Sequence, residues 1–133
     1  MIAGSLERLH PSMIVKSGLK AENISTDPDV VKQYRIDPYI HDKISLRLFS
    51  AVNKAADYIM KHAGEIDIPM LLMHGGNDRI TSHIASKRFA EKNEKFATLN
   101  IWDELYHELH NETIRDEVFK FIIDWLKIYF NEK

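Results

Sequence analysis

The chain has 133 residues, of which 44% are hydrophobic and 29% charged, and this ordinary balance argues against extensive disorder. Its 18 Lys and Arg against 20 Asp and Glu leave a net charge of −2, and no dense basic run points to a nucleic-acid partner. The absence of cysteine excludes disulfides and thiolate metal sites and is compatible with the cytoplasmic location that we expect.

Neither a membrane span nor a leader sequence is expected. No apolar stretch approaches the ~20 residues that cross a bilayer as a helix. Residues 1–5 lack a basic stretch followed by a long apolar run, so we expect no signal peptide.

The first forty or so residues are expected to be largely irregular, with one short helix. Asp27 can accept hydrogen bonds from the first free amides of a helix, and Pro28 suits its first position, so the sequence predicts a helix to about Tyr34. Asp37-Pro38 would end it. The apolar residues between 6 and 15 could contact a lipid-like substrate or simply pack against the fold, and both alternatives stay open.

From Ser45 onwards the pattern becomes regular. Apolar residues recur at three- and four-residue steps over 45–62, which predicts a helix that ends near Gly64. The almost continuous apolar run 68–74 indicates a buried strand, and 97–102 indicates a second one. Helices are predicted over 82–93, capped by Ser82, and over 113–130, where Thr113 and Asp116 have the spacing of a capping box. This alternation predicts an α/β fold of parallel strands with flanking helices.

Polar side chains follow both predicted strands. The first loop contains His74, Asn77 and Asp78, and the second contains Asp103, Glu104, His107, Glu108 and His110. Ligand-binding groups of open parallel sheets lie beyond the carboxyl ends of the strands, so neighbouring strands would bring Asp78 close to His107. A carboxylate beside an imidazole is the acid–base part of a nucleophilic triad.

Three segments resemble one known family in the same order. Residues 68–81 (IPMLLMHGGNDRIT) resemble the strand and acid loop of the monoacylglycerol lipase and lysophospholipase group of α/β-hydrolases, which are serine hydrolases. Residues 105–112 (LYHELHNE) resemble the catalytic histidine loop of that group, and residues 24–41 resemble the end of its cap region. The resemblance covers nearly the whole chain from about Pro11.

The resemblance implies that the chain is the C-terminal half of such a hydrolase. Residues 1–44 would end a helical cap region, and 45–133 would form the C-terminal part of the core. Asp78 would be the triad acid and His107 the general base in the hydrolysis of a lipid-like carboxylic ester, with no cofactor or metal. The Gly-x-Ser-x-Gly turn that carries the nucleophile in the family does not occur in this chain, so no esterase turnover is expected from it alone.

Plainer interpretations of these residues remain. Asp78 could be a turn residue, and His107 an exposed loop histidine. A metal site that combines both with His74 and His110 is disfavoured, because His107 and His110 lack the four-residue spacing of a helical metal motif. Gly75 and Gly76 are expected to allow a tight turn at the strand end. Asn111 and Glu112 are interpreted as helix-start residues.

Two other functions also stay open. The chain could be an inactive fragment that acts through self-association, or by binding its missing N-terminal half, at the exposed edge of the strand 68–74. The same fold could alternatively support peptide or thioester cleavage.

Overall fold

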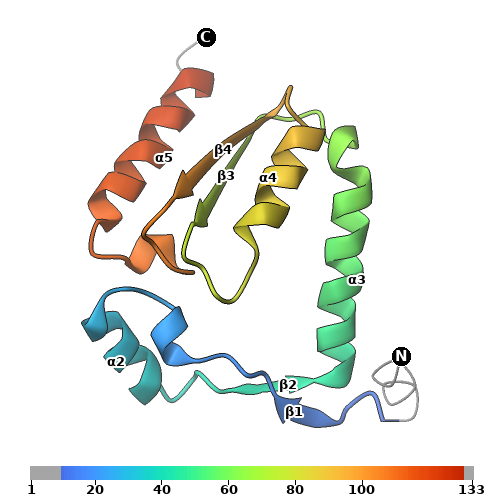
Figure 1. Ribbon diagram of the computed structural model, residues 1–133, viewed down its shortest axis with the longest axis vertical. Coiled ribbons are helices and arrows are strands. Elements are labelled where there is room, and N and C mark those ends of the chain that lie inside the picture. The colour runs from blue at the N-terminus through green and yellow to red at the C-terminus, as the bar shows by residue number, and fades with distance from the viewer. Residues whose placement is uncertain (1–9, 131–133) are drawn as a thin grey trace.

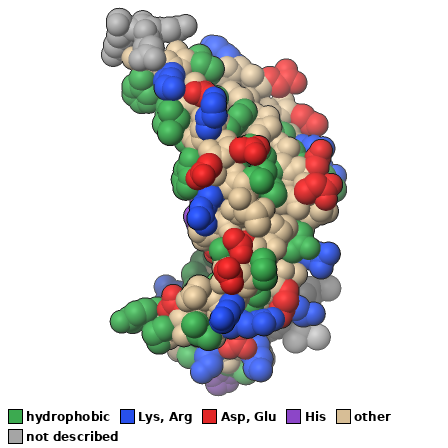
Figure 2. Space-filling model, turned by 90° about the vertical axis from the view of Figure 1, so that its left-hand side faces the viewer, with side chains coloured by type: hydrophobic (Ala, Val, Ile, Leu, Met, Phe, Trp, Pro, Cys, Tyr) green, Lys and Arg blue, Asp and Glu red, His purple; other side chains and the backbone are tan. Residues whose placement is uncertain are grey.

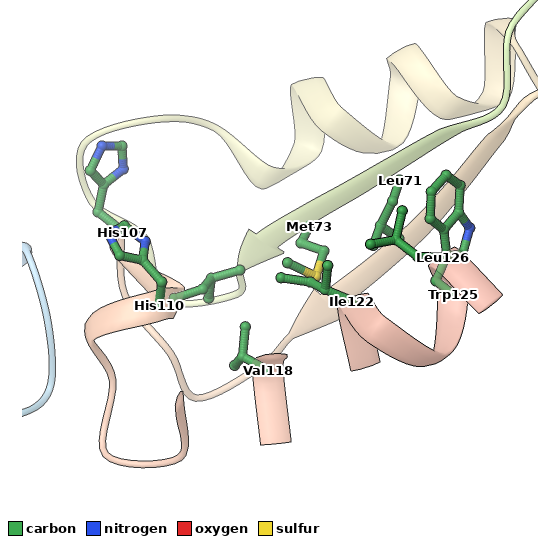
Figure 3. A pocket seen from close by; sticks show the side chains of 9 residues that line it. Leu71, Met73, His107, His110, Val118, Ile122, Trp125 and Leu126 are labelled. Atoms are coloured by element: carbon green, nitrogen blue, oxygen red, sulfur yellow. The ribbon is translucent and has the colours of Figure 1, made fainter. Parts of the chain in front are cut away.

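The computed structural model describes residues 10–130, and its second half is an α/β unit. In chain order this unit contains β3 (Met70–Gly75), α4 (His83–Lys92), β4 (Ala97–Trp102) and α5 (Arg115–Phe130). The two strands are parallel, with Met70 opposite Ala97 and Gly75 opposite Trp102. Helices α4 and α5 lie on opposite sides of this two-stranded sheet (Figures 1 and 3). The predicted α/β class is confirmed.

Local chemistry explains where the elements of this unit begin. Pro69 has no amide hydrogen, and strand pairing starts one residue later, where the amide of Met70 donates to the carbonyl of Phe96 at 2.8 Å. The hydroxyl of Ser82 accepts a hydrogen bond from the amide of Ala85 at 3.2 Å and thereby caps α4, as the sequence predicted.

The N-terminal part is more regular than expected. The three-residue strands β1 (Ile14–Lys16) and β2 (Lys43–Ser45) pair in antiparallel fashion, which corrects the prediction of an irregular segment. Between them lie the 3-10 helix η1 (Ala21–Asn23) and α2 (Pro28–Ile36), and the carboxylate of Asp27 caps α2 by accepting from the amide of Asp29 at 2.9 Å. Strands this short leave no periodic pattern in the sequence, so only their pairing reveals them.

Helix α3 (Leu46–His62) begins where the sequence predicted, with Ser45 accepting from the amide of Leu48 at 3.1 Å. Its apolar face is nevertheless open, since Phe49, Val52 and Ile59 are 53%, 57% and 50% exposed. Figure 1 shows α3 standing at one side of the α/β unit. The apolar spacing therefore identified a helix correctly, but the surface that would cover it is absent from residues 10–130.

The hydrophobic core lies between the sheet, the loop after β4 and the start of α5. Its buried members are Leu105, Leu109 and Val118, and the partly buried residues packed on them are Met73, Trp102, Ile114 and Ile122. Helix α5 begins at Arg115 rather than at 113, because a short 3-10 helix η3 (Leu109–Asn111) and a turn precede it. The capping box expected from Thr113 and Asp116 is therefore wrong.

Some predictions lie beyond what the structure describes. Residues 1–9, with the apolar Leu6 and Leu9, are outside the described residues. The division into cap and core at residue 44 and the cytoplasmic location stay predictions. Over the described range, helices that combine the length and apolarity of a membrane span are absent.

Candidate active site

The loops that follow β3 and β4 are joined by backbone hydrogen bonds. The amide of Gly76 donates to the carbonyl of Trp102 at 2.8 Å, and the amide of Asn77 donates to the carbonyl of Leu105 at 3.1 Å. These bonds join the two loops beyond the last paired residues of the strands, Gly75 and Trp102. They fix Asp78 relative to the segment that carries His107.

Two glycines allow the loops to approach this closely. A Cβ atom on Gly75 would fall on the carbonyl oxygens of Leu105 and Tyr106, and one on Gly76 would lie 2.6 Å from the Cα of Asp103. Neither glycine has a positive φ, since Gly18 is the one glycine with a positive φ within residues 10–130. The expected tight turn is present, because the amide of Asp78 donates to the carbonyl of Gly75 at 3.2 Å, but it is the close backbone approach that requires glycine at these two positions.

Asp78 lies at the centre of a dense set of donors. Its Oδ1 accepts from the amides of Ile80 at 2.7 Å and Thr81 at 3.1 Å. Its Oδ2 accepts from the Thr81 hydroxyl at 2.7 Å and lies 2.9 Å from Nδ1 of His107. The side chain of Asp78 is only 2% exposed. The carboxylate is therefore held rigidly while both of its oxygens are satisfied.

These donors keep Asp78 ionised. Burial opposes the charge and raises the pKa of the carboxyl, but the hydrogen bonds from His107, from the Thr81 hydroxyl and from the amides of Ile80 and Thr81 together outweigh burial. The pKa of Asp78 is thus held well below its usual range.

The tautomer of His107 follows from this charge. An ionised carboxylate only accepts hydrogen bonds, so the proton of a neutral His107 ring lies on Nδ1, which faces Asp78. Nε2 is then the basic nitrogen, and no side chain or backbone group from residues 10–130 forms a hydrogen bond with it. The His107 side chain is 34% exposed, so this nitrogen is available to a further group.

A second histidine contacts the same carboxylate oxygen. Nε2 of His74 lies 3.0 Å from Oδ2 of Asp78, and Nδ1 of His74 forms a 2.8 Å hydrogen bond with the hydroxyl of Ser86 on α4. His74 therefore links α4 to the acid loop. The sequence placed it near the site but assigned it no partner.

The other polar candidates do not join this cluster. His110 lines a cavity of about 440 Å³ next to His107, and the remaining walls come from β3, from Leu109 and from α5: Leu71, Met73, Val118, Ile122, Trp125 and Leu126 (Figure 3). The Glu104 carboxylate accepts a hydrogen bond from the Asn77 side chain, at 3.5 Å, and contacts neither Asp78 nor His107. Across the part of the chain that is described, clusters of three or more His, Cys, Asp or Glu side chains that could hold a metal ion are absent.

Sequence reasoning misjudged one further residue. Glu112, which we interpreted as a helix-start residue, is fully buried and accepts a 2.7 Å hydrogen bond from the amide of Tyr106, next to His107. Its other partners lie more than 80 residues away in sequence, in the segment that precedes α2. The one signal in the sequence was an acidic residue directly after Leu109–Asn111. An acidic residue is also favoured at the start of a helix, so this signal could not reveal the buried role of Glu112.

The fold thus brings an Asp after one parallel strand against a His after the next, the arrangement expected from the resemblance to α/β-hydrolases. A family model described as "Serine aminopeptidase, S33", a family of hydrolases, matches residues 1–114. The chain belongs to this family.

Relatives support the same assignment. An uncharacterized abhydrolase domain-containing protein of Dictyostelium discoideum is 33% identical over 90% of this chain, and a monoacylglycerol lipase of Mycolicibacterium smegmatis is 28% identical over 94%. The crystal structure of a monoacylglycerol lipase from Paleococcus ferrophilus superimposes with a TM-score of 0.88 and 33% identity over 94% of the chain.

The chain spans only part of these proteins. It covers 13% of the Dictyostelium protein, 45% of the Mycolicibacterium lipase and 49% of the Paleococcus structure. This partial coverage is consistent with the C-terminal half of the hydrolase fold, as the resemblance implied.

Proposed function

We propose that this chain supplies the acid and the base of a serine ester hydrolase whose nucleophile lies outside it. The observation that carries the proposal is the 2.9 Å contact between Nδ1 of His107 and Oδ2 of Asp78, together with an Nε2 that faces no partner in the described residues. Asp78 would be the triad acid and His107 the general base.

The chemistry follows from the tautomer. A serine hydroxyl supplied by the missing part would give its proton to Nε2 of His107 as its oxygen bonds to the acyl carbon. The imidazolium that forms would be stabilised by the ionised Asp78, and it would return the proton to the leaving alcohol when the ester bond breaks. Water would repeat the cycle on the acyl-enzyme.

The substrate class is inferred from similar proteins. Two of them are named monoacylglycerol lipases. A lipid-like carboxylic ester, such as a monoacylglycerol or a lysophospholipid, is therefore the substrate that we propose for the complete enzyme. The family description names an aminopeptidase, so peptide cleavage is the competing reaction to test.

A reconstitution experiment tests this proposal. The chain would be co-expressed with the N-terminal half of the Paleococcus monoacylglycerol lipase, and the purified complex assayed with a p-nitrophenyl ester, a monoacylglycerol and an amino-acid p-nitroanilide. Ester hydrolysis by the complex, and none by either half alone, is expected. Hydrolysis of the anilide alone would contradict the proposed substrate class.

Matched variants separate catalysis from assembly. His107→Ala and Asp78→Asn should remove ester hydrolysis without dissociating the complex, whereas Glu104→Gln on the same loop should leave it unchanged. A complex that forms but hydrolyses no ester would overturn the proposal, as would saturable, His107-dependent hydrolysis by this chain alone.

A second candidate function is association without catalysis. The edge of β3 away from β4 pairs with no strand in residues 10–130, and it adjoins the apolar cavity beneath α5. The indole N–H of Trp125, which lines this cavity, is buried without an acceptor in the described residues. Figure 2 shows hydrophobic side chains along its left-hand margin, above and below a hollow in the outline.

The missing half of the hydrolase is the occupant that fits this surface, because the Mycolicibacterium and Paleococcus monoacylglycerol lipases are about twice as long as the chain. Size-exclusion chromatography with light scattering would test the alternative, in which the free edge pairs with a second copy. A concentration-dependent dimer that dissociates when the N-terminal half is added would show that both partners bind the same surface. A chain that stays monomeric at all concentrations and does not bind the N-terminal half would exclude association as its function.

A further inference from the structure

Glu112 joins two distant segments through a buried carboxylate. Its Oε1 accepts from the amide of Tyr106 at 2.7 Å. Its Oε2 accepts from the amide of Thr26 at 2.9 Å, from the hydroxyl of Ser25 at 3.2 Å and from the hydroxyl of Thr26. The residue is 0% exposed, so every donor that it uses comes from the protein. The two oxygens thus bind two different parts of the chain.

The same segment also fixes the other side of His107. The amide of Glu108 donates to the carbonyl of Ile24 at 2.8 Å. The amides immediately before and after His107 are therefore both held, one by Glu112 and one by the segment that Glu112 binds. The Ser25 hydroxyl has a single proton, which it shares between the carbonyl of Asn111, at 2.9 Å, and Oε2 of Glu112.

Packing alone does not require a carboxylate here. A buried charge costs several kcal/mol of desolvation in general, and an apolar side chain of similar volume is often as stable. What the carboxylate provides is a set of directional bonds that fixes the position of one segment against the other.

We infer that Glu112 is a positioning residue for His107, and that it makes the His107–Asp78 contact depend on residues 24–27, directly before α2. The catalytic meaning of this link rests on the proposed function. The link itself is a property of the folded chain and can be tested without any hydrolase activity.

Glu112→Gln breaks the link at one defined point. Three donors face Oε2 and one faces Oε1, so the amide oxygen of Gln would take the place of Oε2. Its NH2 group would then point at the amide of Tyr106, donor against donor. Glu108→Gln is the matched control, because it removes the same charge beside His107, while among residues 10–130 the Glu108 carboxylate accepts only from the side chain of Asn111.

The readout is the exchange with water of the Nδ1 proton of His107, measured by NMR on the 133-residue chain with ¹⁵N-labelled histidine. Asp78→Asn identifies this proton by weakening its hydrogen bond. In Glu112→Gln the proton should exchange about tenfold faster or vanish, the change expected for the loss of one hydrogen bond to a charged group. In Glu108→Gln it should exchange at the original rate.

Intact amide signals from β3 and β4 show that a variant is folded. If Glu112→Gln unfolds the chain, Thr26→Val is the variant to measure instead. It removes the hydroxyl donor to Oε2 but keeps the backbone amide, so the Nδ1 proton of His107 should exchange severalfold faster. An unchanged exchange rate in a folded Glu112→Gln variant would overturn the inference. If that variant unfolds, an unchanged rate in Thr26→Val would overturn it. If the reconstituted complex fails to hydrolyse esters, the proposed function fails, but the measured effect of Glu112 on the exchange of the His107 proton remains valid.

Discussion

Nε2 of His74 lies 3.0 Å from Oδ2 of Asp78, the same oxygen that faces His107. One carboxylate oxygen is therefore shared by two imidazoles from different segments. Because the other nitrogen of His74 binds Ser86, the position of the acid is fixed from α4 as well as from the base loop.

Replacing His74 should therefore destabilise the chain. His74→Phe keeps an aromatic ring but removes the polar contacts with Asp78, Ser86 and Thr81, and we expect the free energy of unfolding to fall by about 1–3 kcal/mol. The matched control is His41→Phe, at an exposed histidine, where the change should stay within about 0.5 kcal/mol. Urea unfolding of the three proteins would measure this, and equal effects at both positions would contradict the anchoring role of His74.

Asp78 should make the fold sensitive to acid. Its pKa is lower in the folded chain than the usual ~3.9 of an unfolded chain, so on acidification the unfolded chain takes up this proton first. The contribution of Asp78 is thus complete above about pH 4 and disappears as the pH falls through the lower, folded pKa. The stability advantage of the native chain over Asp78→Asn should shrink accordingly below about pH 4 in urea titrations.

A surface carboxylate provides the control for this titration. The pKa of Asp124 is also lowered, by hydrogen bonds from Lys120 and then from Lys127, but the Asp124 side chain on α5 is 46% exposed. Solvent screens such pairs, so Asp124→Asn should hardly change the unfolding curve at any pH. A larger acid effect at Asp124 than at Asp78 would refute our account of the buried carboxylate.

Because the two loops approach so closely, adding one methyl group at Gly75 should strongly destabilise the fold. Gly75→Ala would place its Cβ on the carbonyls of Leu105 and Tyr106, which are backbone atoms, so the loops must separate. We expect a loss of about 3 kcal/mol or slightly more in the free energy of unfolding. Gly64→Ala, whose Cβ would lie 3.1 Å from the carbonyl of Lys92, should cost clearly less. Thermal unfolding compares the two, and similar melting temperatures would argue against the loop contact.

If the proposed function is right, the acid and the base act as one unit. In the reconstituted hydrolase, Asp78→Asn and His107→Ala should each lower kcat by about 10⁴-fold. The double variant should be no slower than the worse single variant, because each substitution already removes the same proton relay. Multiplicative losses in steady-state assays would show that the two residues act independently.

Local chemistry let the sequence predict much of this structure. Asp27 and Ser82 cap their helices as expected, since a capping residue and the helix it starts are neighbours in the chain. The meeting of Asp78 and His107 was also predictable, because parallel strands place their following loops at one edge.

The failures concern contacts between distant segments. Glu112 looks like a helix-start residue until Ser25 and Thr26 are seen beside it. Similarly, the turn at Gly75 was predicted, but the need for glycine there was not, because that need comes from the carbonyl of Leu105 against it. In both cases the partner is tens of residues away, and no local pattern records it.

Helix α3 has a further consequence for how the isolated chain would behave. Its ends are tied to other segments, through the 3.0 Å bond from the amide of Leu46 to the carbonyl of Met13 and the 2.8 Å bond from Lys92 to the carbonyl of Met60. Its middle turns leave apolar side chains such as Phe49 and Val52 more than half exposed, so these turns should open most readily to a protease. Brief trypsin digestion should cut there first and leave a resistant remainder that holds the acid and the base.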